Sequence, residues 1–258
     1  MKLIIGDIGN TTSKIYLVSK KSYKIIKVFS IETKKIISTN YIKKIFKGKS
    51  IKNKNLLKKA LFASVVPSKY LIFKKFLSKY YNIRSYEIKD KKIKNIIRIN
   101  IKKPKQVGSD RIANATGASK MFNSNCIIID FGTATTFDVV KKGGIYIGGL
   151  IAPGIELSLK NLYTSTAKLP LVKVKKTEKI IGKNTQEAMH SGFFWGYLGL
   201  VKSIIFGIKK ETKSKYKLIC TGGLSTLFSR AISSKCTVSK YITLKGIVEI
   251  YKKNERNL

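Results

Sequence analysis

The chain has few of the residues that build disulfide frameworks or metal clusters. It contains three cysteines (Cys126, Cys220 and Cys236) and one histidine (His190) in 258 residues. An odd number of cysteines without C-x-x-C spacing supports neither a disulfide framework nor a zinc site, and a single histidine excludes a multi-histidine metal site. Cys126 and Cys220 each lie in an apolar run, so we expect both to be small core residues.

Long apolar runs are also missing. No stretch of eighteen apolar residues occurs, which argues against a membrane span, and the apolar stretch Leu3–Ile5 is too short for a signal peptide. We therefore expect a cytoplasmic protein. With 258 residues, 43% of them hydrophobic, the chain can form two domains with substantial cores.

Acidic residues and arginine are scarce in a strongly basic chain. Thirteen Asp and Glu stand against 53 Lys and Arg, for a net charge of +40, and only five of the basic residues are Arg. Such a charge favours nucleic-acid binding through phosphate contacts. Arg is the residue that recognises bases and phosphates with paired hydrogen bonds, however, and the lysines are scattered along the chain. Abundant Ile, Asn and Tyr accompany them, so the pattern favours compositional drift toward A/T-rich codons, with loose attraction of polyanions as a by-product.

Apolar periodicity predicts an α/β protein. The expected strands are three in residues 2–31, forming an antiparallel meander, one at 61–67 stopped by Pro67, three in residues 125–154, and one at 217–225. The expected helices are part of 33–59, then 68–81, 107–122, most of 155–210, and 245–254, and residues 83–101 form a connection with short strand-like pieces. In the helix at 68–81, one face is expected to carry Tyr70, Leu71, Phe73, Phe76 and Leu77.

The opening pattern of the chain occurs twice. LIIGDIGNTTSKIYLV (residues 3–18) aligns with IIIDFGTATTFDVV (residues 127–140): each has an apolar strand, an Asp, a Gly, small polar residues and a second strand. The copies lie about 123 residues apart, which predicts a duplicated unit and two domains, 1–115 and 116–258.

Both copies are suited to holding phosphate. Asp7 and Asp130 each end a predicted buried strand, where a carboxylate can bind a hydrated Mg²⁺. In the first copy, Gly9 lets the backbone approach a phosphate, and the polar residues Asn10, Thr11 and Thr12, with Lys14, supply donors. An ordinary hairpin turn also favours Gly, Asn and Asp. Only five Asp occur in the chain, however, and two of them occupy matching positions in the repeat.

Two further segments are candidates for chemistry. Thr221-Gly222-Gly223 follows a predicted strand, and its glycines would permit flat approach of an adenine or ribose, although a plain loop has the same composition. Gly108-Ser109-Asp110-Arg111 puts an acid and a rare Arg at a helix start. Asp110 could accept a hydroxyl proton and Arg111 could hold an anion, although Asp110 could instead act as a helix cap. Neither G-x-x-x-x-G-K-[ST] nor G-x-G-x-x-G after the first strand occurs, so a nucleotide site must be of another type.

The order of these motifs resembles the type III pantothenate kinase family of the acetate and sugar kinase, heat-shock ATPase and actin superfamily. The matching segments cover nearly the whole chain. They are Asp7 to Thr11, Ser64 to Pro67, Gly108 to Arg111, Asp130 to Thr136, Gly148 to Gly154, Leu169-Pro170, Gly182 to Thr185, and Thr221 to Gly223.

The resemblance implies an α/β fold of duplicated ribonuclease-H-like domains with mixed sheets and a central nucleotide cleft. It implies ATP-dependent phosphorylation of pantothenate, the first step of coenzyme A biosynthesis, with Mg²⁺, a monovalent cation (K⁺ or NH₄⁺) and a homodimer. The implied ATP-binding residues are Asp7, Ile8, Gly9, Asn10, Thr11, Thr12, Ser13, Lys14, Thr133, Thr221, Gly222 and Gly223. The implied substrate-binding residues are Gly108, Ser109, Asp110, Arg111 and Thr185.

Three of these residues have more specific implied roles. Asp110 is the implied proton acceptor, Asp130 binds the monovalent cation, and Asp7 binds Mg²⁺ through the phosphates. One position departs from the family, because Ile101 stands where relatives usually carry a Tyr that encloses pantothenate. Two alternatives therefore stay open: another small-molecule kinase of the same fold, or a basic nucleic-acid-binding regulatory protein on this scaffold.

Overall fold

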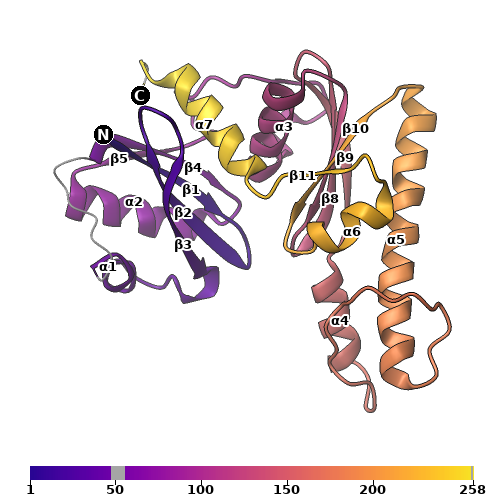
Figure 1. Ribbon diagram of the computed structural model, residues 1–258. Helices are drawn as coiled ribbons and strands as arrows, with labels where there is room; N and C mark the ends of the chain where they lie inside the picture. The colour runs from indigo at the N-terminus through magenta and orange to yellow at the C-terminus, as the bar shows by residue number, and fades with distance from the viewer. Residues whose placement is uncertain (48–55, 257) are drawn as a thin grey trace. The chain divides into compact units, whose positions relative to one another are not determined.

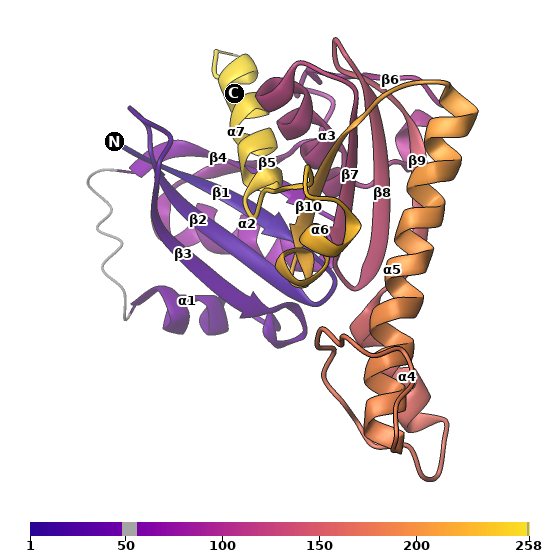
Figure 2. The ribbon, with the colours of Figure 1, turned by 45° about the vertical axis from the view of Figure 1, so that its right-hand side comes forward.

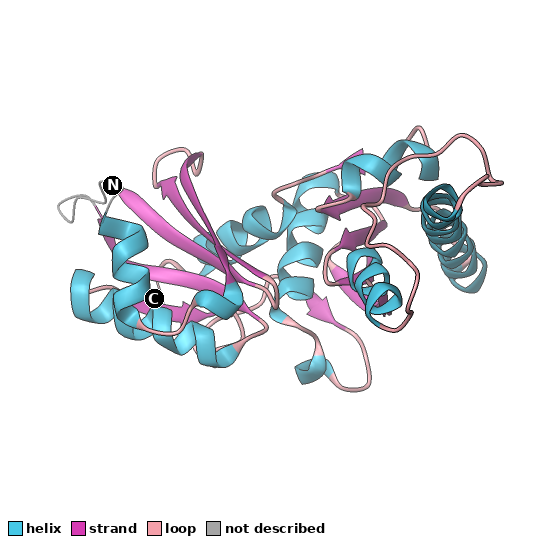
Figure 3. Cartoon of the chain, turned by 90° about the horizontal axis from the view of Figure 1, so that it is seen from below, coloured by secondary structure: helices cyan, strands magenta, loops and turns pink. Residues whose placement is uncertain are grey.

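The computed structural model describes residues 1–47, 56–256 and 258, and it divides into two compact units. The first unit comprises Met1–Met121 and Ile242–Leu258, and the second comprises Phe122–Tyr241. The sequence had suggested 1–115 and 116–258, and the largest difference is the last helix, which joins the first unit. Both units contain helices and strands (Figure 3).

The first unit is built on a five-stranded sheet in the order β3-β2-β1-β4-β5 (Figure 1). The strands of this sheet are β1 (Lys2–Ile8), β2 (Thr12–Ser19), β3 (Ile25–Glu32), β4 (Leu56–Ser64) and β5 (Arg84–Glu87), and the two-residue β6 (Arg98–Ile99) that follows in the chain is not part of it. Its helices are η1 (Thr33–Lys35), α1 (Thr39–Lys47), α2 (Pro67–Tyr81), η3 (Pro104–Gln106), α3 (Ser109–Phe122) and α7 (Ile242–Asn254). The predicted meander, with β1, β2 and β3 antiparallel, is confirmed.

The second unit repeats this strand order as β9-β8-β7-β10-β11. Its strands are β7 (Cys126–Phe131), β8 (Ala134–Lys141), β9 (Ile145–Pro153), β10 (Lys217–Gly222) and β11 (Thr237–Val238). Its helices are α4 (Ile155–Thr164), α5 (Thr185–Thr212) and α6 (Ser225–Ile232), with α5 running along the sheet in Figure 2. In both units an antiparallel meander is followed by two parallel strands, so the predicted duplication and the mixed sheets are confirmed.

The sequence predictions differ from the structure at a few places. The strand predicted at 61–67 is β4, which ends at Ser64, and Pro67 begins α2 because proline is well tolerated in a first helical turn. Leu71 is 52% exposed, whereas the other four residues of the predicted face are buried. Residues 165–184 lie outside helices α4 and α5, and α6 and β11 were not predicted. Part of the helix expected in 33–59 falls outside the described residues.

Each sheet has one face covered by a hydrophobic cluster. In the first unit Ile4 and Ile8 of β1 pack in a cluster with Phe46 of α1 and with Phe73 and Phe76 of α2. In the second unit the cluster includes the alternate residues Ile127, Ile129 and Phe131 of β7 and residues of α4, α5 and α6. Because side chains alternate along a strand, the residues between these point to the opposite face. Asp7 and Asp130 are both of that second kind.

Helix α5 is long and apolar enough, by length and composition alone, to cross a membrane. One side of it is a core surface, since Phe194, Leu198, Val201 and Ile205 are buried in the cluster of the second unit. Only 33% of its most apolar stretch is buried, and Phe206 is 68% exposed. The helix therefore has both a buried face and an exposed apolar face.

Helices α3 and α7 are in backbone contact within the first unit. A Cβ atom added at Gly246 of α7 would lie 1.8 Å from the carbonyl oxygen of Ala113, and one added at Gly117 would lie 2.4 Å from that of Ile242. Beside them, the Thr243 hydroxyl donates to Asn114 Oδ1 at 2.7 Å. This close crossing fixes α3, the helix that carries Asp110.

Replacing Gly246 therefore tests the crossing. Gly246→Ala should lower the free energy of unfolding by about 1–3 kcal/mol, because the added methyl meets backbone that cannot move aside. Gly207→Ala in α5 is the matched control: nothing lies within 4 Å of the added atom, and alanine favours the helix by about 1 kcal/mol. Urea denaturation followed by circular dichroism measures both. If both variants were stabilised, the close contact would be refuted.

Candidate active site

The first Asp-Gly loop joins β1 to β2. Asp7 is the penultimate residue of β1, paired with Lys14 of β2 and with Ala63 of β4. It is half-buried, on the sheet face opposite the cluster of α1 and α2. Since β1 and β4 are parallel and both end beside it, the Asp7 carboxylate lies at the edge of the sheet where a small ligand can be reached.

Thr33 holds this loop in place. Its hydroxyl donates to the Gly9 carbonyl at 2.7 Å, so the Ser13 hydroxyl, 2.8 Å away, donates to Thr33. The Thr33 backbone N–H donates to the Thr11 carbonyl at 2.9 Å, and the Gly9 N–H donates to the Thr12 carbonyl at 3.2 Å. Thr33 lies outside every sequence motif, so its role could not be predicted from the sequence.

The predicted residues of the first loop separate into two kinds. Ser13 is fully buried against Thr33, and Ile8 is 1% exposed in the core with its carbonyl accepting from the Val65 N–H at 3.0 Å. The side chains of these two residues support the loop from inside. The exposed residues of the same loop are Asn10, Thr11 and Thr12.

The second loop, between β7 and β8, has the same plan. Asp130 is the penultimate residue of β7, and it pairs with Thr136 of β8 and with Thr221 of β10. Asp130 pairs six residues ahead and Asp7 pairs seven ahead, so this loop is one residue shorter. Thr133 is exposed in it. A loop backbone hydrogen bond recurs too, here from the Gly132 N–H to the Ala134 carbonyl at 3.2 Å.

The Thr221-Gly222-Gly223 turn lies directly against Asp130. A Cβ atom at Gly222 would be 2.6 Å from Asp130 Oδ1, and Gly222 has a φ of +85°, so only glycine fits there. The Gly223 N–H donates to the Phe131 carbonyl at 3.1 Å, and the Ser225 hydroxyl donates to the Gly222 carbonyl at 2.8 Å. The structure thus brings together two segments of the second unit that are about 90 residues apart in the sequence.

Asp110 lies in the first turn of α3 and is half-buried. Its Oδ1 accepts the Arg111 backbone N–H at 2.8 Å, and a Cβ atom at Gly108 would be 2.5 Å from the same oxygen. Burial raises the pKa of the Asp110 carboxyl, opposed by the Arg111 N–H and by the charges of Arg111 and Lys89. A partly desolvated carboxylate with a raised pKa is suited to accepting a proton.

Glu87 joins two of the sequence motifs, and the sequence did not reveal it. Its carboxylate accepts from the Ser64 N–H at 3.3 Å and the Lys89 N–H at 2.7 Å, and it hydrogen-bonds the buried Ser109 side chain. Burial raises the pKa of Glu87 against these hydrogen bonds. Glu87 therefore ties the end of β4 to the start of α3, next to Asp110. It lies in the lysine-rich connection, where no spacing distinguishes it.

Lys89 stabilises the backbone segment that precedes α3. Its Nζ donates to the Lys105 carbonyl at 2.8 Å and to the Val107 carbonyl at 3.0 Å. These bonds hold the backbone just before Gly108, so the segment from Gly108 to Arg111 is anchored from both sides.

Thr185 is exposed at the first position of α5, in the second unit. The residues before it build the helix start: Asn184 Oδ1 accepts the Glu187 N–H at 2.9 Å, and Glu187 Oε2 accepts the Lys183 N–H at 2.8 Å. A Cβ atom at Gly182 would be 2.3 Å from the Ala188 nitrogen. The motif Gly182 to Thr185 thus forms a rigid start for α5 and leaves the Thr185 hydroxyl accessible.

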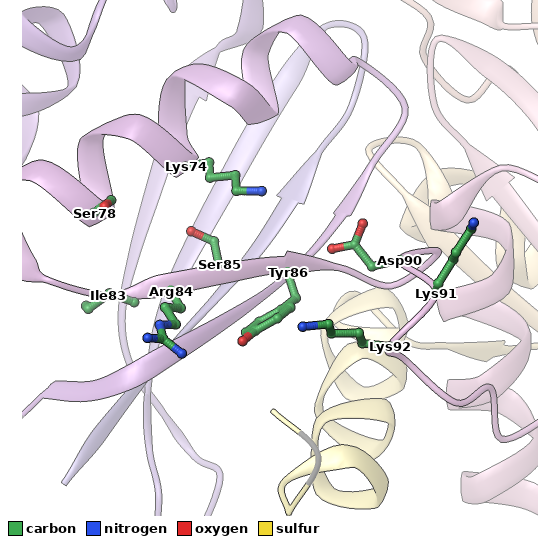
Figure 4. Close-up of a pocket in the computed structure, with 9 residues that line it drawn as sticks. All are labelled: Lys74, Ser78, Ile83, Arg84, Ser85, Tyr86, Asp90, Lys91 and Lys92. Atoms are coloured by element: carbon green, nitrogen blue, oxygen red, sulfur yellow. The ribbon is translucent and has the colours of Figure 1, made fainter.

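A separate cavity of about 450 Å³ lies along β5 of the first unit (Figure 4). Its lining is basic, with Lys74 from α2, Arg84 from β5, and Lys91 and Lys92 from the following loop, beside Asp90. Among the described residues that line it, none belongs to the predicted ATP or substrate sites.

The raised pKa of Asp110 predicts how its removal affects stability. Near neutral pH the ionised carboxylate is penalised in the folded state, so Asp110→Asn should raise the free energy of unfolding. The wild-type protein regains this deficit when the carboxyl is protonated, so the difference should shrink as the pH falls toward about 4. Urea denaturation of both proteins across this range measures it. A difference that grows on acidification would contradict the raised pKa.

Comparison with known proteins identifies the family. Residues 3–206 match the family model described as Type III pantothenate kinase. Proteins named type III pantothenate kinase from Pelagibacter ubique and Endomicrobium trichonymphae are 47% and 37% identical, covering 95% and 96% of this chain and 97% of each relative.

Solved structures show the fold. The activator of 2-hydroxyisocaproyl-CoA dehydratase from Clostridium difficile, solved with bound ADPNP, aligns with a TM-score of 0.56 at 12% identity, covering 99% of this chain and 96% of that one. The expected fold of actin-like ATPases and sugar kinases is therefore confirmed. With the family model matching most of its length, the chain belongs to the type III pantothenate kinase family.

Proposed function

We propose that the protein catalyses ATP-dependent phosphorylation of pantothenate to 4'-phosphopantothenate, the first step of coenzyme A biosynthesis. The observation that supports this reaction most strongly is the position of Asp110. Its half-buried carboxylate, whose pKa is raised, lies at the start of α3 within the motif Gly108 to Arg111. Membership of the kinase family supports the reaction class. Half-buried Ile101, at the position where the family usually carries a Tyr, keeps another small hydroxyl substrate as the second candidate.

ATP is the co-substrate, and residues of both Asp-Gly loops bind it in this proposal. The exposed polar side chains Asn10, Thr11 and Thr12 supply hydrogen-bond donors to phosphate oxygens, Lys14 supplies a cation, and Thr133 contributes from the second loop. The turn Thr221 to Gly223 gives flat backbone for the nucleoside. Gly9 contributes to ATP binding through its backbone. Buried Ile8 and Ser13 contribute by supporting the loop from inside.

Two cations complete the proposed site. The Asp7 carboxylate fits Mg²⁺, which takes one or two carboxylates together with substrate phosphates and water. Asp130, whose Oδ1 lies against the Thr221–Gly223 turn, fits a monovalent cation such as K⁺ or NH₄⁺, which accepts carboxylate and backbone oxygens. When bound, the divalent cation offsets negative charge on the transferring phosphoryl group.

Transfer depends mainly on positioning and on charge. Asp110 accepts the proton of the substrate hydroxyl as that oxygen attacks the γ-phosphorus, and Arg111 holds the pantothenate carboxylate. Ser109, with its hydroxyl on Glu87, and Gly108 position this pair, and Thr185 offers a hydroxyl to the substrate. Burial raises the pKa of Asp110, which makes its carboxylate a stronger base than an exposed one.

A homodimer and a cytoplasmic location belong to the same proposal. The exposed side of α5 supports the dimer: Phe206 is 68% exposed, and Gly192, Gly196 and Gly199 have open space where side chains would stand. Small residues at this spacing let another helix approach closely, and a second copy would cover the apolar face.

The function is tested by a coupled assay of ADP release with pantothenate and a panel of sugars, with and without K⁺. We expect turnover with pantothenate, and we expect Asp110→Asn to reduce it by about 10²- to 10⁴-fold. Asp90→Asn is the matched control, since Asp90 lies in the same unit and accepts a backbone bond from Glu87 that an amide oxygen can also accept. Wild-type turnover in Asp110→Asn would refute the assignment of the base. Turnover with a sugar alone would favour the second candidate.

The hydrogen bonds of Thr33 predict that its replacement changes the KM for ATP selectively. Thr33→Val leaves the Gly9 carbonyl and the Ser13 hydroxyl without their partner, so the loop loses its geometry and the KM for ATP should rise by about tenfold, equivalent to about 1.4 kcal/mol. Thr33→Ser keeps the hydroxyl and should behave like the wild type. Steady-state kinetics with each substrate varied separates the effects. An equal rise in the KM for pantothenate would argue against a role confined to this loop.

A further inference from the structure

Cys220 and Cys236 form a pair that sequence spacing gave no reason to expect. Their Sγ atoms lie 2.9 Å apart, and both are free thiols. Cys220 belongs to β10, and Cys236 directly precedes β11, which pairs with β10 in parallel. The third cysteine, Cys126, is buried and lies beside Ser124.

The two sulfurs differ in access. Cys220 is fully buried, as predicted from its apolar run, whereas Cys236 is only partly buried. The hydrogen bond between the two thiols lowers the pKa of Cys236 and raises that of Cys220. Thiolate character and access together decide which cysteine reacts first, so Cys236 is the attacking sulfur and Cys220 the one that follows.

We infer that Cys236 and Cys220 form a thiol–disulfide exchange site for small disulfides such as glutathione disulfide. The Cys236 thiolate attacks one sulfur of the small disulfide, forming a mixed disulfide and releasing one thiolate. The Cys220 thiol then attacks the Cys236 sulfur and gives its proton to the departing small thiolate, forming the internal disulfide and releasing the second small thiol. Two protein thiols are oxidised and one small disulfide is reduced to two thiols, so the step balances and excess thiol reverses it.

Closing the bond needs little movement. A disulfide bond is about 2.05 Å long, so the sulfurs approach by under about 1 Å from their present separation. The backbone around them is fixed: the Ser239 N–H donates to the Cys220 carbonyl at 2.9 Å, and the Cys236 N–H donates to the Ser233 carbonyl at 3.0 Å. The bond closes a short loop that contains α6, and disulfides of this kind in reducing compartments are generally transient.

The cysteine pair lies next to the turn Thr221 to Gly223. A link between the pair and ATP binding at this turn rests on the proposed function. Cys220 directly precedes Thr221, and Ser225 at the start of α6 holds the Gly222 carbonyl at 2.8 Å. The disulfide tethers both ends of this segment, so we expect oxidation to change the KM for ATP by at least about threefold. Cys236→Ser, which cannot form the bond, should show no change under the same treatment.

Mass spectrometry of the full chain tests the site without any assay of activity. After incubation with glutathione disulfide, the wild type should lose two hydrogen atoms, and digestion should yield a Cys220–Cys236 linked peptide that reductant separates. Cys220→Ala should accumulate a glutathione adduct on Cys236, whereas Cys126→Ala, the control, should form the same internal disulfide as the wild type.

Three free thiols in treated wild type, or an adduct on Cys126, would overturn the inference. The linked peptide in the wild type is decisive even if a variant does not fold. A linked peptide without kinase activity would overturn the proposed function and leave the exchange site standing. A linked peptide with an unchanged KM for ATP would overturn the connection to the turn.

Discussion

The parallel pairing of the strand that follows each meander is the constraint on which the rest of the structure depends. In the first unit β4 runs beside β1, so Asp7 pairs with Ala63 and both strands end at one edge. In the second unit β10 runs beside β7, so Asp130 pairs with Thr221. In each unit, the register therefore places an aspartate beside the start of a neighbouring loop. A shift by one residue would turn either carboxylate into the hydrophobic cluster.

The candidate site residues are held in place by polar side chains to which we assign no contact with a ligand. Thr33 fixes the first loop through two hydroxyl bonds and one backbone bond, and Glu87 connects Ser64 to Ser109. Thr33 is buried and Glu87 is half-buried, so leaving their partners unsatisfied would cost free energy that the fold does not otherwise recover. The close crossing at Gly246 fixes α3 from the other side. The position of Asp110 therefore depends on residues in two other segments, one at Glu87 and one at Gly246, that are distant from it in the sequence.

The sequence predicted the parts whose local pattern is sufficient. The meander, α2, the duplicated loops and the family all follow from strand alternation, helical spacing and motif order. Leu71 was wrongly expected inside because helical spacing defines a face only to within part of a turn. Short elements such as β11, with two residues, carry too little pattern to be recognised.

Contacts between distant segments could not be predicted in the same way. Glu87 and Thr33 act through partners that folding brings to them, and nothing in their own neighbourhood indicates it. The Cys220–Cys236 contact is the clearest case, because the two cysteines are sixteen positions apart and this spacing fits no known motif. The +40 charge was the most prominent compositional feature, yet family membership supports a small-molecule kinase.

In the proposed reaction, the protein moves the γ-phosphoryl group of ATP to the hydroxyl of pantothenate. The most direct measurement is ³¹P nuclear magnetic resonance of a reaction containing the purified protein, ATP, Mg²⁺, K⁺ and pantothenate. We predict a new phosphate monoester signal that grows as ADP appears and that requires pantothenate. ADP and inorganic phosphate accumulating at the same rate, with no ester, would contradict the account.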